Sequence, residues 1–127
     1  MLILVKQLLP YQPELIVLCD QAETPLHNME LELLESNTRV NCVSYLADIT
    51  NKTRMSNMFE EFKPQYVYHA AAYKHVPMME LCPTEAVRNN VIAVKVIADL
   101  AVLHNVERFV MISTDKAVNP TNVMGAS

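Results

Sequence analysis

Three adjacent residues, Thr114, Asp115 and Lys116, place a hydroxyl, a carboxylate and an amine directly after an apolar run. A carboxylic acid and an amine side by side can donate and accept protons on one substrate, which is what general acid–base catalysis requires. The same residue types also form ordinary polar turns. From its residues alone, the triplet is either a catalytic group or a turn.

Other polar or small residues follow apolar runs in the same way. Asp20 closes the run 15–19, where it would accept a hydrogen bond from a ribose hydroxyl of NAD or cap the next helix or turn. No Arg or Lys adjoins it, which disfavours a 2′-phosphate. The small residues 70–72 would let a cofactor approach the backbone, although tight helix packing selects the same side chains. Lys74 and His75 follow in a loop, where exposed polar pairs are usually solvated.

The elements that must position these residues alternate along the chain. Apolar runs without period-2 alternation predict strands at 15–18, 39–46, 66–69 and 108–112. Apolar spacing, prolines and cap residues predict helices over 1–9, 24–36, about 50–62 and 83–105, and another beginning near 121. In the second of these helices, Thr24 is expected to be the N-cap residue and Pro25 to lie in the first turn. Strands that alternate with helices predict a parallel sheet between helical layers, a Rossmann-like α/β fold in one domain spanning 1–127.

The long helix carries apolar residues on two sides. One predicted face holds Val87, Val91, Val94, Ala98 and Ala101, and the other holds Ile92, Val96, Leu100 and Leu103. We expect the sheet to cover one face and another helix or a second subunit to cover the other.

Composition excludes several classes of protein. The 127 residues are 51% hydrophobic and 19% charged with a net charge of −4, which indicates a folded domain and not a disordered chain. No basic stripe is present, so we expect no nucleic-acid partner. The longest apolar stretch, 91–103, is short and contains Lys95 and Asp99, so no membrane span or signal peptide is expected. These features predict a cytoplasmic location.

Glycine and cysteine usage limits the kinds of site. The single glycine, Gly125, leaves no Gly-rich phosphate loop. Cys19, Cys42 and Cys82 are too widely spaced for a disulfide framework or a zinc knuckle. We therefore expect buried free thiols and no metal site.

Three long segments together resemble one protein family. They are 69–80 (His-Ala-Ala-Ala-Tyr-Lys-His-Val-Pro-Met-Met-Glu), 86–91 (Ala-Val-Arg-Asn-Asn-Val) and 107–127, which contains Ser-Thr-Asp-Lys-Ala-Val-Asn-Pro-Thr-Asn-Val-Met-Gly-Ala-Ser. The chain is similar over essentially its whole length to the UDP-N-acetylglucosamine 4,6-dehydratases. These are extended short-chain dehydrogenases, and the group includes capsular and O-antigen polysaccharide biosynthesis proteins of bacteria.

The resemblance implies a role for each matching residue. Thr114, Asp115 and Lys116 match the catalytic triplet, with Lys116 as the base at C5 of the sugar and Asp115 as the acid for the departing 6-hydroxyl. The positions implied to serve the cofactor are Asp20 at the adenosine ribose, Asp48 and Ile49 at adenine, Ala70, Ala71 and Ala72 beside the pyrophosphate and nicotinamide ribose, and Asn90, which ties neighbouring strands together. Lys74 and His75 are implied to shape the sugar side.

The implied reaction converts a UDP-N-acetylhexosamine into a 4-keto-6-deoxy sugar. Hydride leaves C4 for NAD(P)+, with NAD favoured, water is eliminated across C5 and C6, and hydride returns to C6. The ketone at C4 acidifies the C5 proton, so a lysine whose pKa is lowered by burial beside the cofactor would serve as the base.

The chain departs from the family pattern at two points. Met124 stands where a tyrosine usually assists C4 oxidation, a substitution shared by long members of the family that attach to the inner face of the bacterial membrane. The family's first strand and Gly-rich turn have no counterpart, so we expect the chain to be the middle of a larger enzyme. Because that strand is central in the sheet, residues 15–19 are expected to pair directly with 66–69, or another chain to fill the gap in an intertwined homodimer.

Three functions remain open at this point. The parent enzyme is expected to be the dehydratase, with residues 1–127 alone inactive and binding no cofactor, because they contain no glycine loop. A catalytically silent fragment that dimerises through the long helix is the second. A UDP-sugar 4-epimerase is the third, although it needs the tyrosine that Met124 replaces and gives Asp115 and Lys116 no task.

Overall fold

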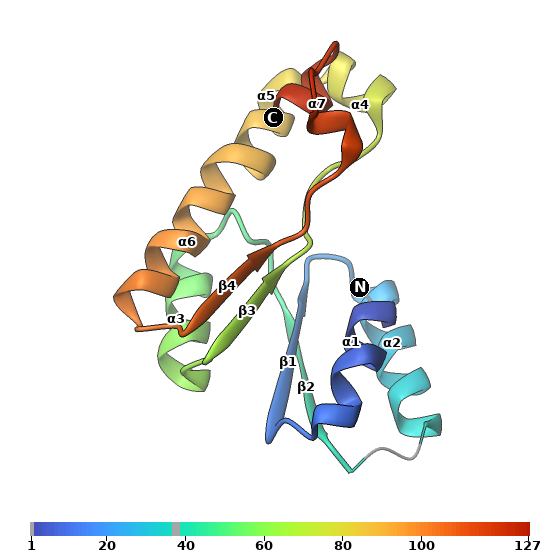
Figure 1. The fold of residues 1–127 in the computed structure, drawn as a ribbon, viewed down its shortest axis with the longest axis vertical. Coiled ribbons are helices and arrows are strands. Elements are labelled where there is room, and N and C mark those ends of the chain that lie inside the picture. Colours follow the sequence, from blue (N-terminus) through green and yellow to red (C-terminus); the bar gives the residue numbers. More distant parts are fainter. Residues whose placement is uncertain (1, 37–38) are drawn as a thin grey trace. The chain divides into compact units, whose positions relative to one another are not determined.

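The computed structural model describes residues 2–36 and 39–127, and the chain divides into two compact units, Met1–Asp48 and Ile49–Ser127. Each unit contains a two-stranded parallel sheet with helices packed against it (Figure 1). The predicted α/β class with parallel strands is confirmed. The division falls inside the range for which the sequence predicts a single domain.

The first unit is a strand–helix–strand motif preceded by a short helix. Its elements are α1 (Leu2–Leu8), the 3-10 turn η1 (Leu9–Tyr11), β1 (Leu15–Asp20), α2 (Glu23–Glu35) and β2 (Asn41–Leu46). Pro10 ends α1, and Gln12 closes the following turn in the left-handed region with φ 51°. β1 and β2 run parallel from the pair Leu15 and Asn41 to the pair Asp20 and Leu46.

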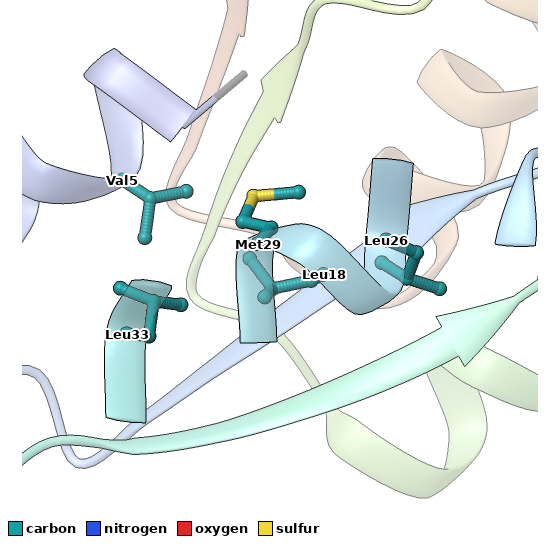
Figure 2. Close-up of a cluster of buried hydrophobic side chains, with 5 residues drawn as sticks. All are labelled: Val5, Leu18, Leu26, Met29 and Leu33. Atoms are coloured by element: carbon teal, nitrogen blue, oxygen red, sulfur yellow. The ribbon is translucent and has the colours of Figure 1, made fainter. Parts of the chain in front are cut away.

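One apolar cluster holds this unit together (Figure 2). Leu18 of β1 is 2% exposed and lies beneath Leu26, Met29 and Leu33, which recur along α2 at helical spacing. Val5 of α1 completes the cluster. The spacing that predicts the helix therefore also supplies the side chains that fix it on the sheet.

The second unit contains the remaining elements. They are α3 (Lys52–Phe62), β3 (Tyr66–His69), α4 (Val76–Leu81), α5 (Pro83–Ala86), the π-helix η2 (Val87–Ala93), α6 (Val94–Leu103), β4 (Arg108–Met111), the 3-10 turn η3 (Asp115–Ala117) and α7 (Val123–Ala126). β3 and β4 are parallel, with Tyr66 opposite Arg108 and His69 opposite Met111. Met55 and Phe59 of α3 are 0% and 1% exposed, and α3 packs against α6.

The long helix predicted from Pro83 is confirmed, but its middle is π-helical and its faces differ from the prediction. Buried residues run Ala86, Asn89, Asn90, Ala93, Ile97, Leu100 and Ala101. Val87 and Val91 are about half exposed, at 44% and 46%, and so is Ile92, at 55%. The wider π turn changes the phase between Val87 and Ala93, so a uniform 3.6-residue period assigns the wrong residues to the covered face.

The strands pair within each of the two units. β1 pairs with β2, and β3 pairs with β4, in two separate sheets. Neither sheet contains the expected pairing of residues 15–19 with 66–69, and because β1 and β3 belong to different units, that pairing stays a prediction. Within the described ranges, β1 and β3 each pair with one strand. The second edge of each of these strands pairs with no strand there, so its amide and carbonyl groups take part in no strand pairing.

One helix boundary differs from the prediction. Thr24 is not the N-cap residue of α2, because the helix begins at Glu23 with Ala22 as its cap, although Pro25 does lie in the first turn. The loop predicted at Lys74 and His75 ends at His75, directly before α4 begins, and Pro77 lies in the first turn of α4 and therefore interrupts no backbone hydrogen bond.

The expectation of buried thiols is partly wrong. Cys19 and Cys42 are half-buried, and Cys82 is exposed between α4 and α5. Burial raises the pKa of the Cys42 thiol. In the described residues, no three His, Cys, Asp or Glu side chains converge as metal ligands, and no helix has the length and apolar character to cross a membrane.

Candidate active site

Asp20 ends β1, where the backbone turns toward α2. Its Oδ1 accepts a hydrogen bond from the Ala22 N–H at 2.9 Å, so the turn-capping role is present. A carboxylate has a second oxygen, and the side chain is only half-buried, so a ribose hydroxyl has an acceptor to reach. The cap and the cofactor role therefore do not exclude each other.

Asp48 and Ile49 follow β2, and both are half-buried. The boundary between the two compact units falls between them. Thr50 accepts a hydrogen bond from Arg88 Nη2 at 3.0 Å, which anchors the start of the second unit to the π-helix. The sequence does not single out Arg88.

In the loop after β3, Ala70, Ala71 and Ala72 are exposed. Two buried asparagines bond to the backbone of this loop. Asn89 Nδ2 donates to the Ala71 carbonyl at 2.7 Å and to Asn90 Oδ1 at 3.0 Å. The asparagines thus fix a stretch of backbone whose outer side stays accessible.

Asn90 bonds to two segments that are distant in the chain. Its Oδ1 accepts from the Tyr73 N–H at 2.8 Å, and its Nδ2 donates to the Tyr73 carbonyl at 3.1 Å and to Ser127 Oγ at 3.0 Å. Asn90 thus joins the loop after β3 to the segment after β4. A contact of Asn90 with the cofactor stays a prediction.

Lys74 and His75 line an open pocket of about 420 Å³. The remaining lining residues are Ala72, Tyr73, Met78, Met79, Cys82 and Glu85. The pocket therefore combines an apolar wall from α4 with charged groups. The substrate-side role of Lys74 and His75 stays a prediction.

Thr114, Asp115 and Lys116 are all exposed after β4. Thr114 caps the 3-10 turn: its Oγ1 accepts from the Lys116 N–H at 3.4 Å and donates to Asp115 Oδ1 at 3.0 Å. The triplet is therefore a turn, and its carboxylate and amine both remain open to a substrate. The structure is therefore compatible with both interpretations of the triplet, a turn and a catalytic group.

Met124 is 5% exposed and packs with Met79 and Ala86 in a second apolar cluster. A buried thioether has no proton to transfer, and its position is filled by packing. Tyr73, which the sequence does not single out, lies at the edge of the same cluster.

Gly125 is buried, and its backbone lies against the turn that bears Lys116. A Cβ at this position would overlap the Lys116 carbonyl oxygen and stand 3.1 Å from Pro120 Cβ. The φ of Gly125 is negative, so the need for glycine is close approach and not backbone conformation.

Glu80 is a further residue that sequence reasoning did not select. Its Oε1 accepts a hydrogen bond from the Val123 N–H at 2.8 Å, across 43 residues of chain. Its only sequence signal is its place at the end of the segment 69–80.

His69 ends β3, directly before the loop 70–75. Its ring is 6% exposed and stacks on Phe109 with centroids 6.2 Å apart, and its Nε2 has no hydrogen-bond partner among the described residues. Burial lowers the pKa of His69 below its ordinary value of 6.5. Burial therefore favours the neutral form of the ring.

Parallel strands, helical crossovers and polar groups at the carboxyl ends of the strands define the Rossmann-like α/β class of proteins. The sequence pattern of one family, described as polysaccharide biosynthesis protein, matches residues 3–127. The chain belongs to this family, a branch of the extended short-chain dehydrogenases.

Two curated relatives show the range of the family. The chain is 47% identical over 123 residues to the capsular polysaccharide biosynthesis protein CapD of Staphylococcus aureus, covering 96% of this chain and 20% of that protein. It is 32% identical over 118 residues to the UDP-N-acetylglucosamine 4,6-dehydratase (inverting) of Campylobacter jejuni, covering 92% of this chain and 33% of that protein. The chain thus spans between a fifth and a third of the length of these two relatives.

Solved structures share the fold. Pen from Bacillus thuringiensis superposes with a TM-score of 0.86 at 30% identity, over 96% of this chain and 37% of that one. The UDP-glucose 4-epimerase of Bifidobacterium longum, solved in complex with NAD+ and UDP, has a TM-score of 0.73 at 22% identity, over 87% of this chain and 32% of that one.

Proposed function

We propose that the protein containing this chain is a nucleotide-sugar 4,6-dehydratase that acts on a UDP-N-acetylhexosamine in the synthesis of a bacterial surface polysaccharide. The similarity to a relative named for this activity supports the substrate and the reaction. The observation that carries the proposal is the capped turn Thr114–Lys116, which presents an acid and an amine at the carboxyl end of β4.

The residues of the first unit fit one end of a nicotinamide dinucleotide. Asp20 keeps a carboxylate oxygen for a ribose hydroxyl while the other caps Ala22. When bound, the cofactor supplies hydride transfer from C4 and back to C6. We favour NAD because no cationic side chain adjoins Asp20 in the sequence to receive a 2′-phosphate.

The chain's own residues would carry the elimination. Neutral Lys116 removes the proton at C5, which the ketone at C4 has acidified, and the C–H electron pair forms the C5–C6 double bond. The C6–O bond breaks, and protonated Asp115 gives its proton to the departing oxygen, which leaves as water. The Thr114 hydroxyl holds Asp115 Oδ1 at 3.0 Å and so orients the carboxyl group for this transfer.

Solvent deuterium tests the proposal directly. The full-length protein is incubated with UDP-N-acetylglucosamine and NAD+ in D2O, and the nucleotide sugars are analysed by mass spectrometry and NMR. We expect loss of one water molecule and one solvent deuterium at C5 of the 4-keto-6-deoxy product. A product epimerised at C4 that has lost no water and carries no deuterium at C5 would refute the dehydratase proposal.

The 4-epimerase is a second candidate because solved epimerases share the fold. At 22% identity, that likeness concerns the fold alone. Both reactions begin with oxidation at C4, so the buried Met124 does not distinguish them. Epimerisation, however, moves no proton at C5 and removes no hydroxyl from C6, so it gives Asp115 and Lys116 no task. The D2O experiment separates the two reactions.

Residues 1–127 expressed alone are expected to bind NAD+ without measurable saturation. Pyrophosphate binding uses a glycine-rich loop at a helix N-terminus, and the segment contains one glycine. Titration with NAD+ and NADH, followed by calorimetry, tests this expectation. Saturable micromolar binding would overturn it.

We propose a cytoplasmic homodimer in which the exposed apolar side of the long helix packs on a second copy. Val102 and Leu103 are 80% and 70% exposed, and Ile92 is 55% exposed on the same continuous helix. Sedimentation of the full-length protein and of its Val102→Glu variant measures this, since a charge at a dimer interface lowers affinity. An unchanged sedimentation coefficient would argue against this face.

A further inference from the structure

Glu80 connects two segments that the candidate site needs in fixed positions. It lies near the end of α4, the helix whose residues wall the pocket beside Lys74 and His75. Its carboxylate accepts the Val123 N–H, the first amide of α7. First-turn amides have no partner within their own helix, so a side chain from elsewhere satisfies this one.

Further contacts fix the rest of α7. Asn122 Oδ1 accepts the Gly125 N–H at 2.8 Å, which sets the first turn. Met124 is buried against Met79, the neighbour of Glu80 on α4. Adjacent residues of α4 thus hold α7 by one apolar and one polar contact.

The position of α7 in turn fixes the turn that carries Lys116. Gly125 touches the Lys116 carbonyl so closely that no β-carbon fits between them, and α7 packs on η3. A shift of α7 by a fraction of an ångström must therefore move the Lys116 backbone or open a gap beneath it.

We propose that Glu80 is a positioning residue for Lys116, acting through the Val123 amide and the contact of Gly125 with the Lys116 carbonyl. The proposal rests on the proposed function for the meaning of Lys116, but its structural part stands apart from the reaction. We assign Glu80 a positioning role and not a catalytic one, because the contact on which the proposal rests is with a backbone amide and not with a reacting group.

Three variants of the full-length protein test the inference. Glu80→Gln keeps an oxygen acceptor, and Glu80→Ala removes it. Glu60→Ala is the matched control, because Glu60 is an exposed glutamate on α3 in the same unit. Hydrogen–deuterium exchange is followed in peptides covering 114–118 and 119–127, together with kcat, KM and the pH profile of dehydration.

In Glu80→Ala we expect faster exchange at the Val123 amide and also at the amides of Ala117 and Val118, whose bonds close the turn. We expect kcat to fall roughly 5- to 100-fold. The lower figure corresponds to the loss of one helix cap, and the upper figure corresponds to a catalytic group misplaced by about an ångström. KM should stay within about twofold, and Glu80→Gln and Glu60→Ala should behave like the unaltered protein.

The outcomes separate the two proposals. Faster exchange confined to the Val123 peptide, or a Glu80→Gln variant as impaired as Glu80→Ala, would overturn the positioning role. If the unaltered protein dehydrates no nucleotide sugar, the proposed function fails, and the exchange of the 114–118 peptide alone decides whether Glu80 positions Lys116.

Discussion

The backbone of Gly125 is in direct contact with the carbonyl oxygen of Lys116, at a separation that leaves no room for a β-carbon. The one glycine in the sequence therefore lies against the turn that carries the candidate base. This contact makes the position of Lys116 sensitive to a substitution that alters no chemical group of the site.

Gly125→Ala should slow the reaction without removing any reacting group. The new methyl group meets backbone at Lys116 and Pro120 Cβ at 3.1 Å, and backbone cannot give way cheaply. We expect a loss of about 1–3 kcal/mol in the free energy of unfolding and a fall in kcat of up to about 100-fold. Urea denaturation and steady-state kinetics measure both. Ala126→Ser, at the exposed neighbouring position, is the control and should change neither.

Lys116→Ala should strongly slow proton removal at C5. General bases contribute typically about 10²- to 10⁴-fold to a rate, and we expect kcat to fall within that range. Deuterium incorporation at C5 in D2O should fall in parallel with it, while binding of the nucleotide sugar stays close to normal. Lys52→Ala, at an exposed position that begins α3, provides the comparison. Deuterium exchange that survives Lys116→Ala would assign the base elsewhere.

Asn90→Ala should destabilise the second unit. The substitution removes the hydrogen bonds that join Asn90 to the Tyr73 backbone and to the Ser127 hydroxyl. An intramolecular hydrogen bond contributes about 0.5–1.5 kcal/mol to stability, so the midpoint of urea unfolding should fall clearly. Asn57→Ala on the exposed side of α3 should leave the midpoint nearly unchanged. Equal midpoints for the two variants would show that water replaces the lost bonds.

His69 should make stability depend on pH. Its folded-state pKa is lowered by burial from 6.5, so the unfolded chain takes up the proton at higher pH than the folded chain does. The contribution of neutral His69 to the free energy of unfolding is complete above about pH 6.5. It is lost as the pH falls through the pKa of His69 in the folded chain. Urea unfolding at about pH 7.5 and about pH 5.5 measures the loss.

His69→Phe keeps an aromatic ring on Phe109 and removes the proton, so the stability of this variant should fall less between the two pH values. His27→Gln, at an exposed position of α2, should fall as much as the unaltered protein. A His69→Phe variant with the same pH dependence as the unaltered protein would exclude His69 as its source.

Local sequence patterns predict most of the elements because each depends on near neighbours. Leu26, Met29 and Leu33 predict α2 and also form its buried face. The alternation of apolar runs and helices likewise predicts parallel strands, and the pairings of β1 with β2 and of β3 with β4 bear this out.

The errors arise where spacing is interrupted or contacts are distant. The π turn at Val87–Ala93 adds a residue to the helical repeat, so Val87 and Val91 are exposed where a regular period predicts a face. The α4 helix is short, and Pro77 in its first turn resembles a loop signal. The contact of Glu80 with Val123 joins residues that are 43 positions apart, so the sequence around neither residue predicts it.

The two apolar clusters described above have a consequence for combining substitutions. Leu18 and the α2 residues form one, Met79, Ala86 and Met124 form the other, and they share no side chain. Effects of mutations without shared partners usually add within about 0.3–0.5 kcal/mol. Substitutions of Leu26 in the first cluster and of Met124 in the second alter the packing of different side chains, so their effects on the free energy of unfolding are expected to add.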